Sequence, residues 1–124
     1  MSRLRGPNAT PLAAGIDTAI VVAFAALGRR NHDEQPGLGG LVDTAWPFLA
    51  GLALGWAVSR AWDRPAEFRT GLIVWPVTVA AGMVLRQLTG DGTATSFIVV
   101  ASAFLGAGLV GWRAIAGRTL RAVA

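Results

Sequence analysis

The chain has 124 residues, of which 53% are hydrophobic and only 15% charged, and its mean hydropathy is +0.52. This composition lies outside the range of ordinary soluble domains, and the lack of cysteine excludes disulfides and thiolate metal sites. The formal net charge is +4, with eleven arginines and no lysine. Because these arginines are dispersed between apolar segments and form no single basic face, we predict no binding to nucleic acid.

Four apolar segments occupy most of the chain, each close to the ~20 residues that a helix needs to cross a bilayer. We predict them as helices over 11–28, 41–59, 71–88 and 94–116. A soluble helix would carry a charged stripe, yet 20–28 and 48–58 contain no charged residue. The short connections make neighbouring helices antiparallel. The prediction is an all-α polytopic membrane protein, a single transmembrane domain over residues 1–124 folded as a four-helix up-down bundle.

The first apolar segment, 11–28, has two interpretations. The basic residues within 1–5, the apolar stretch and the tripeptide Ala23-Phe24-Ala25 resemble a secretory signal with its cleavage site. Asp17 interrupts the apolar stretch, however, and three further spans follow it. We therefore predict that the segment is retained as the first membrane helix.

The arginines are distributed unevenly between the two sides of such a bundle. With the N-terminus inside, eight lie in the inner segments, and the outer side holds Arg29, Arg30 and Arg86. Because cytoplasmic segments are enriched in basic residues, we predict that both termini are cytoplasmic and that the protein lies in the inner or plasma membrane of the cell. Trp56 and Trp112 then fall near the inner interface, where indole rings are common.

Two Trp-Pro pairs, Trp46-Pro47 and Trp75-Pro76, interrupt the second and third predicted helices. A proline inside a helix removes one backbone hydrogen bond, so each pair predicts a kink. Because these helices run in opposite directions, the kinks lie toward opposite faces of the membrane. Two interpretations stay open: ordinary kinks, or broken helices related by a pseudo-twofold axis that build a midplane site, as in some transporters.

Four ionisable residues lie within the predicted spans, where a charge is costly unless it is paired or hydrated. Asp17 and Arg113 belong to the inner halves of the first and fourth helices, whereas Asp43 and Arg86 lie toward the outer side. Their depths predict two ion pairs, Asp17 with Arg113 and Asp43 with Arg86.

The third predicted helix carries a stripe at helical spacing, made of Trp75, Thr78, Gly82 and Arg86. A ring, a hydroxyl, a gap and a guanidinium on one face suit the wall of a polar cavity, in which Arg86 would hold an anion or Trp75 a cation. Alternatively, Thr78 bonds to its own backbone and Arg86 extends to the interface.

Small residues recur at four-residue spacing in three predicted helices: Gly15, Ala19 and Ala23; Gly51 and Gly55; Ala103, Ala107 and Gly111. In lipid, helices associate by close backbone packing, which such faces permit. The faces serve either packing within the bundle or a dimer interface. A chain of this size encloses little volume alone, so we expect a homodimer or a larger membrane complex in the lipid bilayer.

The inventory for catalysis is poor. The chain has no cysteine, tyrosine or lysine, and no glycine-rich phosphate loop of recognisable spacing. Its single histidine, His32, lies beside Asp33 and Glu34 and is a candidate pH-responsive element, with a metal site as the weaker alternative. We predict that the protein is not an enzyme and holds no metal or other cofactor.

Several motifs combine along the chain: Asp17, Gly28-Arg29 with His32, Trp46-Pro47-Phe48, Trp75-Pro76 with Thr78, Arg86, Ser96-Phe97-Ile98 and Gly111-Trp112-Arg113. Together they resemble the DUF3054 family of small four-helix membrane proteins from prokaryotes. The resemblance covers nearly the whole chain, roughly from Asp17 to Arg113. It implies the architecture but no mechanism, because the family has no assigned function.

Two functions from different classes are compatible with these features. The function that we predict is a transporter or channel for a small ion or solute, whose path is lined by Asp17, Trp75, Thr78 and Arg86. The alternative is a non-catalytic accessory or structural subunit that packs against a larger membrane complex. A cavity that joins Asp17 to Arg86 would favour transport, whereas a dry, fully paired interior beside an exposed Gly/Ala groove would favour the subunit.

Overall fold

The computed structural model of the chain describes residues 9–31, 38–90 and 93–123. These residues form four helices and no strand: α1 (Ala9–Asn31), α2 (Leu38–Ser59), α3 (Phe68–Leu88) and α4 (Thr95–Val123). All four are long and apolar enough to span a membrane. The prediction of an all-α chain with four apolar spans is confirmed, and the chain fits a multi-pass membrane protein. The largest boundary difference is at α4, which continues beyond the predicted end at 116.

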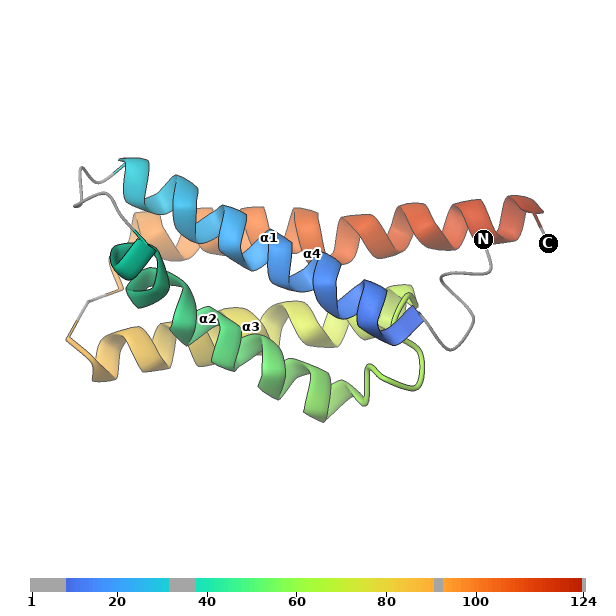
Figure 1. Cartoon of the computed structure of the whole chain (residues 1–124), viewed down its shortest axis with the longest axis horizontal. Helices are drawn as coiled ribbons and strands as arrows, with labels where there is room; N and C mark the ends of the chain where they lie inside the picture. Colours follow the sequence, from blue (N-terminus) through green and yellow to red (C-terminus); the bar gives the residue numbers. More distant parts are fainter. Residues whose placement is uncertain (1–8, 32–37, 91–92, 124) are drawn as a thin grey trace.

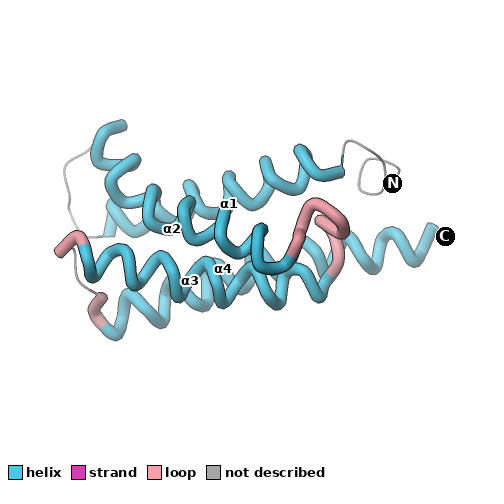
Figure 2. The backbone as a smooth tube through the Cα atoms, turned by 90° about the horizontal axis from the view of Figure 1, so that it is seen from below, coloured by secondary structure: helices cyan, strands magenta, loops and turns pink. Residues whose placement is uncertain are grey.

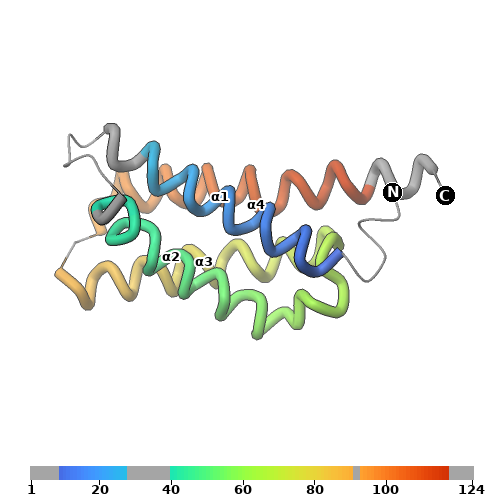
Figure 3. Tube along the Cα trace, in the orientation of Figure 1, coloured from blue at the N-terminus to red at the C-terminus, as the bar shows by residue number. Residues whose placement is uncertain are grey.

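The helices form an up-down bundle (Figure 1). Each helix packs against its neighbours in the chain, and α1 packs against α4 to complete the ring. The start of α1, the end of α4 and the α2–α3 connection lie at the same end of the bundle (Figure 2). We call this the inner end, after its predicted orientation, and the opposite end the outer end. The trace in Figure 3 shows α1 running obliquely to α4.

The closest helix packing joins α2 to α3. A Cβ atom at Gly51 would lie 2.7 Å from the backbone oxygen of Thr78, and one at Gly55 would lie 3.1 Å from that of Val74. The two glycines therefore let the backbones approach within the bundle, as small residues do between membrane helices. Of the two interpretations of this glycine pair, packing inside the bundle is the one observed.

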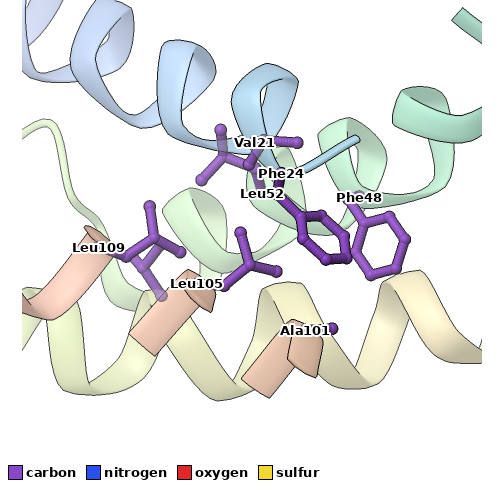
Figure 4. Packing of buried hydrophobic residues seen from close by; sticks show 8 residues of the cluster. Val21, Phe24, Phe48, Leu52, Ala101, Leu105 and Leu109 are labelled. Carbon is purple, nitrogen blue, oxygen red and sulfur yellow. The ribbon is translucent and has the colours of Figure 1, made fainter. Parts of the chain in front are cut away.

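The core is an apolar cluster to which all four helices contribute. Figure 4 shows most of its side chains meeting between the helices: Val21, Phe24, Phe48, Leu52, Val74, Ala101, Leu105 and Leu109. Toward the outer end it becomes aromatic, because Phe24 meets the Phe48 ring edge-on at 5.1 Å and Phe48 stacks on Phe97 at 5.9 Å. The Phe48 ring occupies the space that a Cβ at Gly82 would fill. The interior is thus filled by side chains.

The two Trp-Pro pairs have different surroundings. α2 and α3 both continue through their prolines, and α2 changes direction within its first half (Figure 1). Pro47 is buried and Trp46 is 40% exposed, whereas Pro76 is exposed and Trp75 is half-buried. The pairs therefore turn opposite members toward the core. The two pairs therefore differ in their surroundings, and the choice between ordinary kinks and a twofold-related site stays a prediction.

Candidate functional site

A closed polar cluster lies in the inner half of the bundle. At its centre, Asp17 of α1 and Arg113 of α4 form an ion pair whose side chains are both fully buried. The guanidinium binds the carboxylate with both terminal nitrogens, at 3.0 Å (Nη1 to Oδ1) and 2.7 Å (Nη2 to Oδ2). This is the pair that the depths of the two residues predicted. Its two-pronged geometry is the strongest form of an arginine–carboxylate contact.

Two tryptophans complete the hydrogen bonds of the carboxylate. The indole Nε1 of Trp56 donates to Asp17 Oδ2 and that of Trp112 donates to Oδ1, both at 2.8 Å. An ionised carboxylate has about four acceptor positions, and all four are occupied. The sequence had placed both indoles near the inner interface without assigning them a partner. A buried carboxylate requires more hydrogen-bond donors than one arginine supplies. This requirement is the feature of the sequence that could have identified the two tryptophans as partners of Asp17.

Arg113 is held by contacts beyond the carboxylate. Its Nε donates to the backbone oxygen of Pro65 at 2.8 Å, and its Nη1 also donates to that of Leu109 at 2.9 Å. A Cβ at Gly71 would lie 3.0 Å from Cδ of Arg113, so this glycine makes room for the arginine stem. The guanidinium also lies 4.6 Å from the Trp112 ring centroid. Through these contacts the cluster joins all four helices and the α2–α3 connection.

The chemistry of this cluster is that of a closed pair. Removing two charges from water costs free energy. The attraction between the charges offsets this cost only when their remaining donors and acceptors also form hydrogen bonds. Here the carboxylate has no acceptor position left for a ligand, and the pair is electrically neutral as a unit. The cluster is therefore built to hold the helices together at the inner end.

The stripe predicted on α3 is divided between two neighbouring helices. Thr78 is fully buried toward α2, and its hydroxyl has no hydrogen-bond partner in the described part of the chain. Trp75 instead faces α4, where its Nε1 donates to the backbone oxygen of Ser102 at 3.0 Å. Its ring lies against Gly106, where a Cβ would be 2.7 Å away. The stripe does not line one common cavity, because a helical face that wide meets both neighbours.

Arg86 turns toward α4 at the outer end. Its guanidinium carbon lies 4.2 Å from the ring centroid of Phe97, within the range of a cation–π contact. Asp43 is exposed on α2, and the described residues include no ion pair between it and Arg86. The predicted pairing of Asp43 with Arg86 is therefore wrong. Similar depth brings two residues together only when their helices also turn them toward each other.

The polar groups at the two ends are separated along the bundle. From Asp17 toward the outer end, α1 contributes Val21 and Phe24 to the apolar core, and α4 contributes Leu109 and Leu105 on the way outward from Arg113. These side chains are buried. The core thus stands between Asp17 and Arg86, the two ends of the path that the transport hypothesis requires.

An apolar groove runs between α1 and α4 on the surface. It has a volume of about 580 Å³ and is lined by Ile16, Ala19, Ile20, Ala23, Phe104, Ala107 and Gly108. A Cβ at Gly15 or at Gly111 would meet nothing within 4 Å. Unlike the glycine pair of α2, Gly15 and Gly111 therefore border open space, whereas Gly108 of the same groove is packed against Ile20 of α1. We call the groove with Gly15 and Gly111 the α1/α4 face.

The candidate site at His32 lies outside the described residues. Among the residues that the structure does describe, no three His, Asp or Glu side chains gather as metal ligands. The acidic side chains of the inner connection, Asp63 and Glu67, are instead paired with arginines.

The comparisons with known proteins place the chain in a family. No curated protein and no solved structure matches it. A family model described as a protein of unknown function matches residues 14–116, a range that includes the whole Asp17–Arg113 cluster and both Trp-Pro pairs. Because this match covers most of the chain, the protein belongs to the DUF3054 family.

Proposed function

We propose that the protein is a non-catalytic structural subunit of a membrane assembly, in which two copies associate through the α1/α4 face. The observation that carries the proposal is the open groove between α1 and α4, whose lining includes the small residues Ala19, Ala23, Ala107 and Gly108, beside a buried ion pair that is fully hydrogen-bonded. An exposed groove with small residues beside a closed ion pair favours a subunit, although the buried hydroxyl of Thr78 leaves the interior short of fully paired. A transporter would instead need polar groups that a substrate reaches.

The shape and lining of the groove favour a second copy of the chain as its occupant. Membrane helices gain nothing from apolar burial alone, since lipid is equally apolar, and they associate where small residues allow close approach. The glycine pair of α2 is already covered by α3, whereas Ala19, Ala23 and Ala107 remain accessible. A second copy presents the same small residues, so two copies related by a twofold axis would bring these faces together.

The test measures association in lipid with a matched pair of variants. Energy transfer between labelled copies in liposomes should report dimers of the wild type, and Ala107→Leu should weaken them at least about fivefold, since overpacking a contact costs ~1–3 kcal/mol. Ala80→Leu makes the same change at an exposed alanine of α3 and should leave association unchanged. A wild type that stays monomeric, or equal effects of both variants, would contradict the proposal.

Transport is the alternative function, and one observation favours it. A groove of about 390 Å³ between α1 and α2 ends at Trp56, the residue that holds Asp17 from its other side. Displacing this indole would connect the groove to the buried carboxylate. Reconstituted protein should then pass a small ion, and Asp17→Asn should abolish that flux. Ion flux that needs Asp17 and persists in Ala107→Leu would replace the subunit proposal with transport.

A further inference from the structure

A second groove lies at the inner end, outside the polar cluster. It has a volume of about 270 Å³ and is formed by the α2–α3 connection and the first turns of α3: Ser59, Arg60, Asp63, Arg64, Glu67, Arg69, Thr70 and Ile73. Three guanidinium groups border it. We propose that this groove binds the phosphate of an anionic phospholipid headgroup, a role separate from the association of subunits.

The arginines of this groove are available to an anion. Arg60 pairs with Asp63 and Arg64 with Glu67, each at 3.4 Å; the two arginines and Asp63 are largely exposed, and Glu67 is 40% exposed. Such exposed pairs are weak and exchange readily for a better acceptor. Arg69 is exposed and makes no hydrogen bond or ion pair with the described residues. A phosphate offers the oxygens that guanidinium groups bind in two-pronged geometry.

The start of α3 adds to the attraction for an anion. The helix begins at Phe68, and its N-cap residue Glu67 makes no side-chain capping bond. The first amide groups of the helix therefore carry a partial positive charge beside Arg69, while the Glu67 carboxylate at the same helix end is paired with Arg64. The hydroxyl of the buried Thr70 donates to the backbone oxygen of Arg64 at 2.7 Å, which ties the connection to this helix end. The positive groups are thus held around one opening.

The surroundings of the groove fit a lipid better than a free anion. Trp62 and Phe68, each next in sequence to a residue that lines the groove, are exposed at 47% and 46%, and an indole ring such as that of Trp62 is typical of the headgroup level. One turn farther along α3, Leu72 and Ile73 are exposed as well, so that Arg69 and Ile73 share a face at i and i+4. A charged rim followed by an apolar wall matches the junction between a headgroup and its acyl chains.

The predicted topology places this groove at the leaflet that carries anionic lipids. The inner end is the arginine-rich side, and basic pockets on the cytoplasmic side of membrane helices bind anionic headgroups. A protein surface would be the other macromolecule to consider, but the continuation from arginine to exposed leucine and isoleucine lies within a membrane span. The lipid is therefore the occupant to which the geometry points.

The test compares two lipids on purified full-length protein. Native mass spectrometry with equal amounts of phosphatidylglycerol and phosphatidylcholine should show preferential retention of phosphatidylglycerol. Arg69→Gln should lower this preference about fivefold, which is the contribution expected of one basic residue at a membrane surface. Asp63→Asn should raise it, because Arg60 loses its competing carboxylate. Arg121→Gln removes the same charge from the same predicted side, far along the sequence from the residues that line the groove, and should change the preference little.

Three results would overturn the proposal. Equal retention of both lipids would show that the groove does not select a charged headgroup. An equal loss in Arg69→Gln and Arg121→Gln would assign the preference to overall charge. Displacement of the lipid by millimolar inorganic phosphate would show that the groove takes the free anion. Far-UV circular dichroism controls the fold of each variant, and energy transfer between copies reports separately whether the association of subunits persists.

Discussion

The Asp17 carboxylate accepts four hydrogen bonds, two from Arg113 and one each from Trp56 and Trp112, without any contact with solvent. At the inner end of the protein, the stability of the buried charge depends on all four of these hydrogen bonds being present. A buried pair is a weak source of net stability compared with apolar side chains, but breaking it by removing one partner is severe, because a bare charge remains.

Removing only one member of the ion pair should destabilise the protein more than removing both. We expect Arg113→Met to lower the free energy of unfolding by about 3–5 kcal/mol, because Asp17 stays buried without its counter-charge. The double variant Asp17→Leu/Arg113→Met should recover a large part of that loss. Unfolding in detergent, followed by far-UV circular dichroism, measures both. If the double variant loses as much stability as the single variants Asp17→Leu and Arg113→Met lose together, this account of the pair is contradicted.

The unpaired hydroxyl of Thr78 leads to the opposite expectation. This side chain is fully buried and its Oγ1 atom finds no partner among the described residues. Thr78→Val keeps the shape and removes the unsatisfied polar atom, so stability should be unchanged or rise by up to ~1–3 kcal/mol. The same unfolding assay checks it, with Thr70→Val as the control that removes a hydroxyl bonded to the backbone oxygen of Arg64. A clear loss of stability in Thr78→Val would show that this hydroxyl has a bonded role.

At the scale of the helices, glycine has two opposite uses. Gly51 and Gly55 of α2 and Gly71 of α3 lie where a Cβ would press on a neighbouring helix, whereas Gly15 and Gly111 face open space.

The end of α2 has a backbone conformation usual for glycine, but an arginine occupies it. Arg60 takes the left-handed conformation (φ 55°) usual for glycine, and the amides of Arg60 and Ala61 donate to Ala57 and Trp56. An arginine at this position keeps a positive charge at the inner groove.

A pair of glycine-to-alanine variants separates the packed face from the open one. Gly51→Ala should cost about 1–3 kcal/mol, because its Cβ would meet a backbone oxygen of α3 that cannot rotate away. Gly111→Ala should leave the monomer unchanged or stabilise it by about 0.5–1 kcal/mol, since alanine favours the helical backbone. Thermal unfolding at protein densities low enough to exclude dimers measures both. Equal losses at the two sites would mean that the α4 glycine is packed as closely as that of α2.

At the scale of the molecule, the bundle has one end tied by the polar cluster and the other filled by aromatic rings. The inner end also gathers the α2–α3 connection with its arginines, while the exposed small residues of α1 and α4 lie along one side. These features keep the same order along the bundle whichever way the protein spans the membrane. The direction itself decides which leaflet meets the arginine groove.

Orientation is testable cleanly because the chain contains no cysteine. Both termini are predicted to be cytoplasmic from the excess of inner arginines. In intact cells, a membrane-impermeant maleimide should label Thr89→Cys, at the outer end of α3, and should label Asp63→Cys only after permeabilisation. The two positions serve as controls for each other, since both are exposed. The reverse pattern would invert the protein and move the groove to the other leaflet.

The helices and one of the two ion pairs could be predicted because they depend on position along the chain. Span length and charge depth follow directly from the order of residues, and Asp17 and Arg113 had no better partner at their depth. The pairing of Asp43 with Arg86 failed on the same argument, since Arg86 meets Phe97 while Asp43 remains exposed. Depth is a property of one helix, whereas contact depends on how two helices are turned.

The number of spans, their apolar character and the arginine-rich side all follow from the order of residues along the chain. The packing of the helices is needed to show that Trp56 and Trp112 donate to Asp17, that the α3 stripe divides between α2 and α4, and that Gly15 and Gly111 face open space while Gly108 does not. The physical reason is the rotation of each helix about its own axis. That rotation is set by the packing of all four helices together, and no single segment contains it.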